Sequence, residues 1–377
     1  MIYLDNAAMV KPSDYVVESV RYAIENSWYN PSANYKCAKE TKNKIEEARK
    51  NVADLIGADP SEIHFTSGAT ESANILLYSF YTDDVYATNI EHPCVSESLN
   101  NYVTTIPVDK YGVVYPSELP LFSDSADGGH TILFIIYANN EIGTIQSMNY
   151  IGNVVCNNRG FLLASDLTQA FGHVPINVKD LNISFAFGSG QKIGGLSGCG
   201  WLYVAKEYES MISPLCDGGK QDIYKSGTEN ITGIIALGAS AWEAKRDLYK
   251  NIKIETELRD YMINKILTEI PDTILIGHPT DRLPNNVNIG FGDCDSESIV
   301  QYLDLNDICC SAGSACHNNK SVDVSPVLRA LRLPTKYIDG SVRFSLSPSN
   351  TKEEIDEVVD VLKRCCATLR SEVSKNE

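Results

Sequence analysis

The middle of the chain reads Ser189-Gly190-Gln191-Lys192-Ile193-Gly194-Gly195, which places one lysine between glycines after an apolar run, residues 183–187. Small residues on both sides allow a tight turn and let a bulky ligand approach the amine closely. A lysine held among apolar groups loses hydration, so its pKa falls and the neutral amine can attack a carbonyl. A surface lysine in a glycine-rich turn would have the same local sequence, so other parts of the chain must distinguish the two.

Short apolar runs alternate with polar helical stretches from residue 85 onward, a pattern typical of a parallel sheet covered by helices. Polar side chains follow four of these runs: His92, Asn140, Asp166 with Gln169, and Lys192. Open α/β sheets bind ligands just beyond the carboxyl ends of their strands. The sequence therefore predicts an α/β fold with a mixed, mostly parallel sheet and a site where these strand ends meet.

A turn rich in Ser, Gly and Thr precedes a helix expected at 73–80; it reads Thr66-Ser67-Gly68-Ala69-Thr70-Glu71-Ser72. Backbone N–H groups at the start of a helix have no partner within the helix and lie at the positive end of its dipole. They can therefore bind a phosphate group. The Thr70 hydroxyl adds a further donor. An ordinary helix N-cap is the competing interpretation.

The pattern changes near residue 240. Long helical stretches follow, then strands at 287–291 and 341–347, then a last helix that begins at a capping box of Thr351 and Glu354. We predict two domains. The large α/β domain comprises residues 15–245, and a smaller α+β domain comprises residues 1–14 and 246–377.

The composition argues against several classes of protein. The 377 residues include 32 basic and 49 acidic side chains, for a formal charge of −17, and no basic run; direct nucleic-acid binding is therefore not expected. No apolar stretch approaches the roughly 18 residues of a membrane span, and the first residues lack a signal-peptide pattern, which favours a cytoplasmic protein. The 11 cysteines show no C-x-x-C spacing, so no metal site is predicted.

A lysine at one strand end, an anion site at a helix start and a carboxylate at another strand end together indicate pyridoxal 5′-phosphate. Lys192 would hold the cofactor as a Schiff base, and the Ser/Gly/Thr turn would bind its phosphate. Asp166 would keep the pyridine nitrogen protonated. Gln169 and Asn140 could hydrogen-bond the phenolic oxygen, and His92 could stack on the ring or transfer protons. Taken alone, Asp166 also fits a helix cap and His92 a structural histidine.

These residues belong to a longer series of motifs that runs over nearly the whole chain. In this order and spacing the series closely resembles the cysteine desulfurases, the NifS-like members of the class-V aminotransferase superfamily. Their fold is type I of the pyridoxal-phosphate enzymes, with a large domain and a smaller α+β domain. The motifs are Leu4-Asp5-Asn6-Ala7-Ala8, Asn30-Pro31-Ser32, Phe65-Thr66-Ser67-Gly68-Ala69-Thr70-Glu71-Ser72, Glu91-His92, Asn139-Asn140-Glu141-Ile142-Gly143, Asp166-Leu167-Thr168-Gln169, Gln191-Lys192, Ser226-Gly227-Thr228, Gly313-Ser314-Ala315-Cys316, Val327-Leu328-Arg329-Ala330-Leu331 and Val342-Arg343-Phe344-Ser345.

The resemblance implies a role for each matching residue. Lys192 would be the Schiff-base lysine, Cys316 the nucleophile that accepts sulfur as a persulfide, and His92 a proton-transfer group. Arg343 would bind the substrate carboxylate as a two-pronged fork, helped by Asn30. The implied cofactor-binding residues are Ala69, Thr70, His92, Asn140, Asp166, Gln169, Ser189, Gln191, Lys192 and Thr228, the last of which would reach the phosphate held by the other subunit of a homodimer.

The implied reaction converts L-cysteine to L-alanine and passes its sulfur through Cys316 to a protein acceptor, in iron–sulfur cluster assembly or nucleic-acid thiolation. The nearest alternatives are a selenocysteine lyase and an aminotransferase of the same fold, and transamination needs no thiol at position 316. A catalytically silent interaction protein is a third. The chain departs from the family pattern at Gln191, usually histidine, and at Lys225, usually arginine. The adjacent Cys309-Cys310 pair is a hypothetical sulfur relay.

Overall fold

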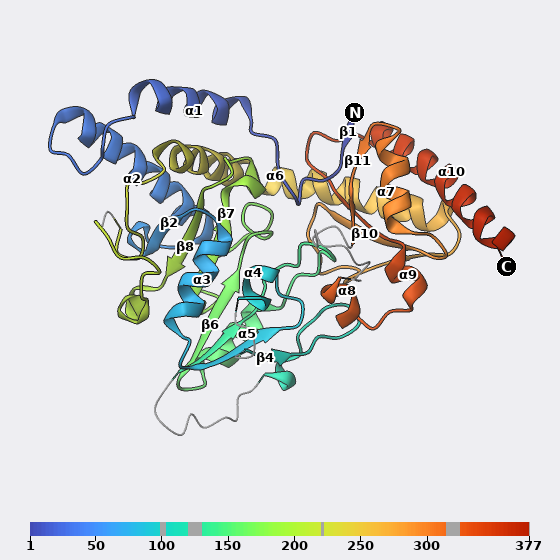
Figure 1. The fold of residues 1–377 in the computed structure, drawn as a ribbon, viewed down its shortest axis with the longest axis horizontal. Coiled ribbons are helices and arrows are strands. Elements are labelled where there is room, and N and C mark those ends of the chain that lie inside the picture. The colour runs from blue at the N-terminus through green and yellow to red at the C-terminus, as the bar shows by residue number, and fades with distance from the viewer. Residues whose placement is uncertain (99–102, 120–129, 220–221, 314–324, 377) are drawn as a thin grey trace.

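The computed structural model describes residues 1–98, 103–119, 130–219, 222–313 and 325–376. Its largest sheet has seven strands in the order β2-β8-β7-β6-β5-β3-β4 (Figure 1). Neighbouring strands are parallel except at β8, which runs antiparallel to both β2 and β7. The predicted fold class, a mixed and mostly parallel α/β sheet, is confirmed. The strands are β2 (Ile63–Thr66), β3 (Asp84–Thr88), β4 (Val103–Ile106), β5 (Thr131–Phe134), β6 (Phe161–Asp166), β7 (Phe185–Ser189) and β8 (Gly200–Val204).

Helices cover both faces of this sheet, which is why its central strands are apolar on both sides. Successive side chains of a strand point to opposite faces. In β7, Phe185 and Phe187 pack in the cluster that contains α3 (Ala69–Ser79) and α4 (Pro93–Ser96). Ala186 between them belongs to the opposite cluster, which contains α2 (Lys36–Ile56), α5 (Met148–Cys156) and α6 (Ile231–Glu269).

A second sheet forms the other half of the molecule. Its four strands are antiparallel in the order β12-β13-β10-β9, and a parallel pair, β1 with β11, lies beside them. Its core of aliphatic side chains is closed by α7, α10 and the far end of α6. The elements are β1 (Ile2–Tyr3), β9 (Thr273–Leu275), β10 (Asn286–Phe291), β11 (Ile308–Cys309), β12 (Ser311–Ala312), β13 (Ser341–Ser345), α7 (Ser296–Asp304) and α10 (Lys352–Asn376).

Two segments of chain connect the sheets. Helix α6 is continuous over 39 residues and runs across the molecule from the large sheet to the second one (Figure 1). The N-terminal segment crosses as well, because β1 pairs with β11 while α1 (Asp14–Asn26) packs against α6. None of the helices in the described ranges combines the length and apolar character needed to span a bilayer.

Helix boundaries follow the local sequence. Helix α2 ends at Gly57, which adopts φ 71°, a conformation that glycine tolerates and that commonly terminates helices. The predicted capping box before α10 is present: Thr351 and Glu354 each accept the backbone N–H of the other. The remaining elements are α8 (Pro326–Ala330), α9 (Thr335–Asp339), and the 3₁₀ turns η1 (Pro60–Glu62), η2 (Pro116–Glu118), η3 (Gly190–Ile193) and η4 (Lys206–Met211).

Candidate active site

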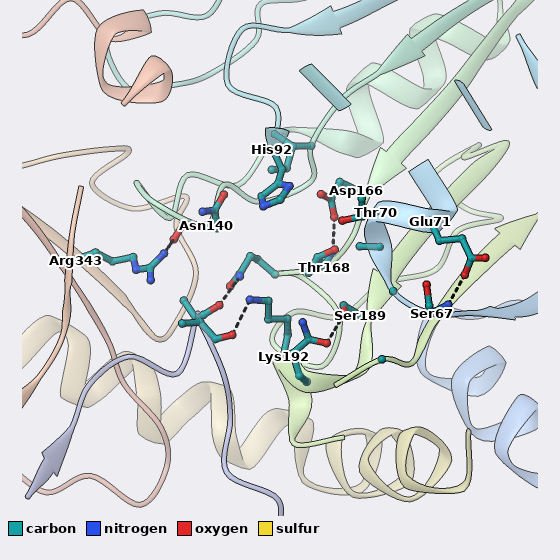
Figure 2. A pocket seen from close by; sticks show the side chains of 18 residues that line it. Ser67, Thr70, Glu71, His92, Asn140, Asp166, Thr168, Ser189, Lys192 and Arg343 are labelled. Atoms are coloured by element: carbon teal, nitrogen blue, oxygen red, sulfur yellow. Dashed lines mark hydrogen bonds between the residues drawn. The ribbon is translucent and has the colours of Figure 1, made fainter. Parts of the chain in front are cut away.

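A cavity of about 370 Å³ lies at the carboxyl ends of β6 and β7 and at the start of α3 (Figure 2). The edge of the sheet is the one that the sequence predicted. Arg343 reaches the same cavity from β13 of the second sheet, so the cavity lies between the two halves of the molecule. The predicted residues that line it are Ala69, Thr70, His92, Asn140, Asp166, Gln169, Ser189, Gln191, Lys192 and Arg343.

Lys192 lies in η3, directly after β7. The turn ends at Gly194, which adopts φ 86° and so reverses the chain where most residues would be strained. The Lys192 Nζ donates a hydrogen bond to the carbonyl oxygen of Ala8 at 2.7 Å. Gln169 Nε2 donates to the neighbouring carbonyl of Ala7 at 3.0 Å. The N-terminal segment therefore orients both side chains at the cavity.

Asp166 ends β6 and is 4% exposed. Burial raises the pKa of this carboxyl, while the backbone N–H of Thr168 at 2.8 Å, His92 and Lys192 oppose the rise. A buried carboxylate needs an opposite charge beside it to remain ionised. A protonated pyridine nitrogen would supply such a charge, so Asp166 fits the ring of pyridoxal 5′-phosphate.

His92 caps the short helix α4 and also lines the cavity, so its position is compatible with both interpretations of this histidine. Its Nδ1 accepts the backbone N–H of Cys94 at 3.2 Å, which leaves Nε2 to carry the proton of the neutral ring. Burial lowers the pKa of His92, and Lys192 lowers it further, whereas Asp166 raises it. The neutral imidazole can stack on an aromatic ring or exchange a proton through Nε2.

The turn before α3 supplies the donors that a phosphate requires. Helix α3 begins at Ala69, four residues earlier than predicted, so the N–H groups of Ala69 and Thr70 belong to its first turn. Ser189 donates to Gln191 Oε1 at 2.5 Å, so the Gln191 amide nitrogen is the atom left to donate. Backbone also approaches closely here, because a Cβ on Gly200 would lie 2.5 Å from Gly68 Cα. These groups fit a phosphate.

Arg343 is 7% exposed and is held by three acceptors. Its Nη1 donates to the Asn140 carbonyl at 3.1 Å, and its Nη2 donates to Asp5 at 2.8 Å and to Ser311 at 3.1 Å. The Nε is buried without a hydrogen-bond partner among the described residues. Arg343 lines the cavity, and a guanidinium can bind a carboxylate through two parallel N–H groups.

Comparison with known proteins identifies the family. The family model described as Aminotransferase class-V matches residues 2–358. The chain belongs to the class-V aminotransferase family. It is 40% identical to the cysteine desulfurase IscS of Methanosarcina thermophila, over 98% of this chain and 93% of that protein. The resemblance recognised in the sequence is confirmed.

Solved structures agree with this class-V aminotransferase assignment. A NifS-like protein from Rickettsia africae superposes with a TM-score of 0.89 at 30% identity, covering 97% of this chain and 99% of that one. A protein titled SspA in complex with cysteine superposes with a TM-score of 0.78 at 29% identity, covering 93% of this chain and all of that one.

Two of the predicted residues, Asn30 and Thr228, do not line this cavity. Thr228 lines a neighbouring cavity of about 190 Å³, which shares Ser67 with the first. The Asn30 side chain accepts the backbone N–H of Ser32 and shapes its own loop. Cys316 lies outside the described residues, so its role stays a prediction.

Two features of the site were not predicted from the sequence. The carbonyls of Ala7 and Ala8 hold Gln169 and Lys192, although their motif indicated only a strand and a turn. Glu91, beside His92, is 5% exposed, and burial raises its pKa to about 8. In the sequence, only the position of Glu91 in the Glu91-His92 motif indicates that this residue belongs to the site.

Proposed function

We propose that this chain is a pyridoxal-phosphate-dependent cysteine desulfurase that converts L-cysteine to L-alanine and transfers the sulfur to Cys316. The observation that carries the proposal is the presence of Lys192, Asp166 and Arg343 around one cavity. Binding of this cofactor requires a reactive amine and an anion beside the ring nitrogen, and binding of an amino-acid substrate requires a cation that receives its carboxylate. The cysteine desulfurase names of relatives support the choice of substrate.

When bound, the cofactor withdraws electrons from the substrate's α-carbon and so weakens bonds at that carbon and its neighbour. The residues that would hold it are Lys192 at the aldehyde, Asp166 at the ring nitrogen, Asn140 and Gln169 at the phenolic oxygen, His92 at the ring, and Ala69, Thr70, Ser189 and Gln191 at the phosphate. Thr228 would bind the phosphate in the other subunit of a homodimer. Gln191 can donate to a phosphate oxygen but adds no positive charge where the family usually has histidine.

Individual side chains would bind the substrate and transfer protons. Arg343 would bind the substrate carboxylate and fix the orientation of the α-carbon, and Asn30 would assist. Lys192 Nζ would move the proton at that carbon. The His92 Nε2 would exchange a proton beside the ring, since Nδ1 is occupied by Cys94. The reacting atoms would thereby be held in one geometry, which accounts for a large part of enzymatic rate enhancement.

Sulfur transfer would take place at Cys316. Its thiolate attacks the substrate sulfur; the new sulfur–sulfur bond forms as the carbon–sulfur bond breaks, and the carbon fragment gains protons to become alanine. The resulting persulfide would pass to a protein acceptor that serves iron–sulfur cluster assembly or nucleic-acid thiolation in the cytoplasm. We also propose that residues 15–245 form the cofactor-binding domain and that residues 1–14 and 246–377 form the domain that carries Cys316.

Alanine and sulfide release from L-cysteine, measured with a thiol reductant, tests the proposal. The wild type is compared with Cys316→Ala and with Cys156→Ala, an exposed cysteine on α5 that serves as the matched control. We expect alanine from the wild type and the control but not from Cys316→Ala. Equal activity in all three would eliminate the nucleophile assignment. No alanine from the wild type, despite bound cofactor, would favour an aminotransferase, and a strong preference for selenocysteine would favour the lyase.

A further inference from the structure

A second cavity, of about 250 Å³, lies on the other side of η3, the turn that carries Lys192 and is called the lysine turn below. Lys192 lines both this cavity and the candidate active site, so its turn forms part of the wall between them. The second cavity is bounded by α6 and by the N-terminal segment, and none of the roles described above involves it. Two of its lining residues, His173 and Glu255, form a buried pair of opposite potential charge.

His173 Nδ1 lies 3.6 Å from Glu255 Oε2, with the two side chains 14% and 3% exposed. This Glu255 oxygen accepts no hydrogen bond within the described chain, so the imidazole is the group that balances it. The backbone of Lys192 also lies close enough to the His173 ring to raise the pKa of the imidazole. A chain of contacts therefore runs from α6 through Glu255 and His173 to the lysine turn.

The charges of this cavity favour an imidazolium. Burial lowers the pKa of His173, but Glu255 and the Lys192 backbone outweigh it, and the pKa is raised from its ordinary value. The other ionisable side chains that line the cavity are Lys11, Lys192, Glu243 and Asp247. Breaking a buried ion pair leaves an uncompensated charge, so the pair resists separation.

We propose that His173 is a positioning residue, held by Glu255, which fixes the backbone of Lys192 from the side opposite the cofactor. Glu255 lies on the continuous helix α6 and so gives His173 a fixed partner, whereas η3 is a single 3₁₀ turn of four residues. The pair fixes the position of the Lys192 backbone and therefore determines how the Lys192 amine reaches the candidate active site. The inference rests on the proposed function only in taking Lys192 as the lysine that holds the cofactor.

The test has one readout that needs no cofactor. Histidine Cε1 resonances are followed by NMR against pH in the apo chain, with the His173 signal assigned from His173→Gln. We expect the titration midpoint of His173 to lie above the ordinary value of histidine in the wild type and to fall in Glu255→Gln. Asp281→Asn is the matched control, because His278 and Asp281 form a similar pair, 3.8 Å apart, with Asp281 72% exposed; His173 should not respond to it.

The second readout is retention of the cofactor. Visible absorbance follows the loss of pyridoxal phosphate from the holoenzyme; we expect this loss to be about tenfold faster in His173→Gln and Glu255→Gln and to be restored in His173→Lys, which keeps the charge. A His173 titration midpoint that is the same in the wild type and in Glu255→Gln, or cofactor loss unchanged in both variants, would overturn the inference. Absence of alanine formation with these two results intact would reject the proposed function alone.

Discussion

Glu91 offers a sharp test of how the site is protonated. Its Oε1 accepts hydrogen bonds from the Thr88 hydroxyl at 2.6 Å and the Ile136 N–H at 2.7 Å, while Oε2 is buried without a partner among the described residues. Burial raises the pKa of Glu91 from 4.5 to about 8; the two hydrogen bonds oppose the rise and the nearby Asp166 adds to it. We therefore predict that Glu91 is neutral at pH 7 and that Glu91→Gln preserves the site.

The size of the effect follows from linkage between protonation and folding. Below pH 4.5, both the folded and the unfolded chain carry the Glu91 proton, and stability does not depend on this group. As pH rises from 4.5 to about 8, the unfolded chain loses the proton while the folded chain keeps it, so stability falls by about 1.4 kcal/mol per pH unit. Glutamine does not titrate in this range. The free energy of unfolding of Glu91→Gln, relative to that of the wild type, should therefore rise by about 3–4 kcal/mol between about pH 5 and 8.

Urea unfolding at several pH values measures this difference. Any fixed cost of placing an amide at the site is the same at every pH and cancels when the pH values are compared. Asp84→Asn is the matched control, because it removes an exposed carboxylate at the start of β3, the strand that precedes Glu91. If the free energies of unfolding of Glu91→Gln and the wild type differ by the same amount at every pH, Glu91 is ionised in the folded protein and burial does not raise its pKa.

Three further predictions concern ligand binding. Arg343→Lys should lower kcat/KM for L-cysteine about 10- to 100-fold, since lysine has no planar fork, whereas reaction with cysteamine, which has no carboxylate, should not change. Lys225→Ala removes a 2.5 Å bond to Glu71, which itself accepts the Ser67 N–H; binding of pyridoxal phosphate should weaken about two- to fivefold in equilibrium dialysis, with pyridoxal binding unaffected. Gly200→Ala should reduce cofactor content about tenfold or more, because its Cβ would displace Gly68; Gly219→Ala, with open space around it, should leave cofactor content unchanged.

The sequence contained the information for the edge of the sheet but not for contacts between distant segments. His92, Asp166 and Lys192 were predicted to meet because parallel strands end at a common edge, and the structure brings them together there. Asp5 and Arg343 are 338 residues apart in the chain, and no local pattern indicates that they pair. The charge state of Glu91 likewise depends on burial by neighbours that a periodic pattern does not specify.

The two crossings between the sheets have a mechanical consequence. Helix α6 is continuous over 39 residues, a length of about 58 Å at 1.5 Å per residue, so one unbroken element links the two halves. The other crossing carries the Ala7 and Ala8 carbonyls that hold Gln169 and Lys192. A movement of the second sheet would therefore displace this segment and, with it, the carbonyl group that accepts the hydrogen bond of the Lys192 amine.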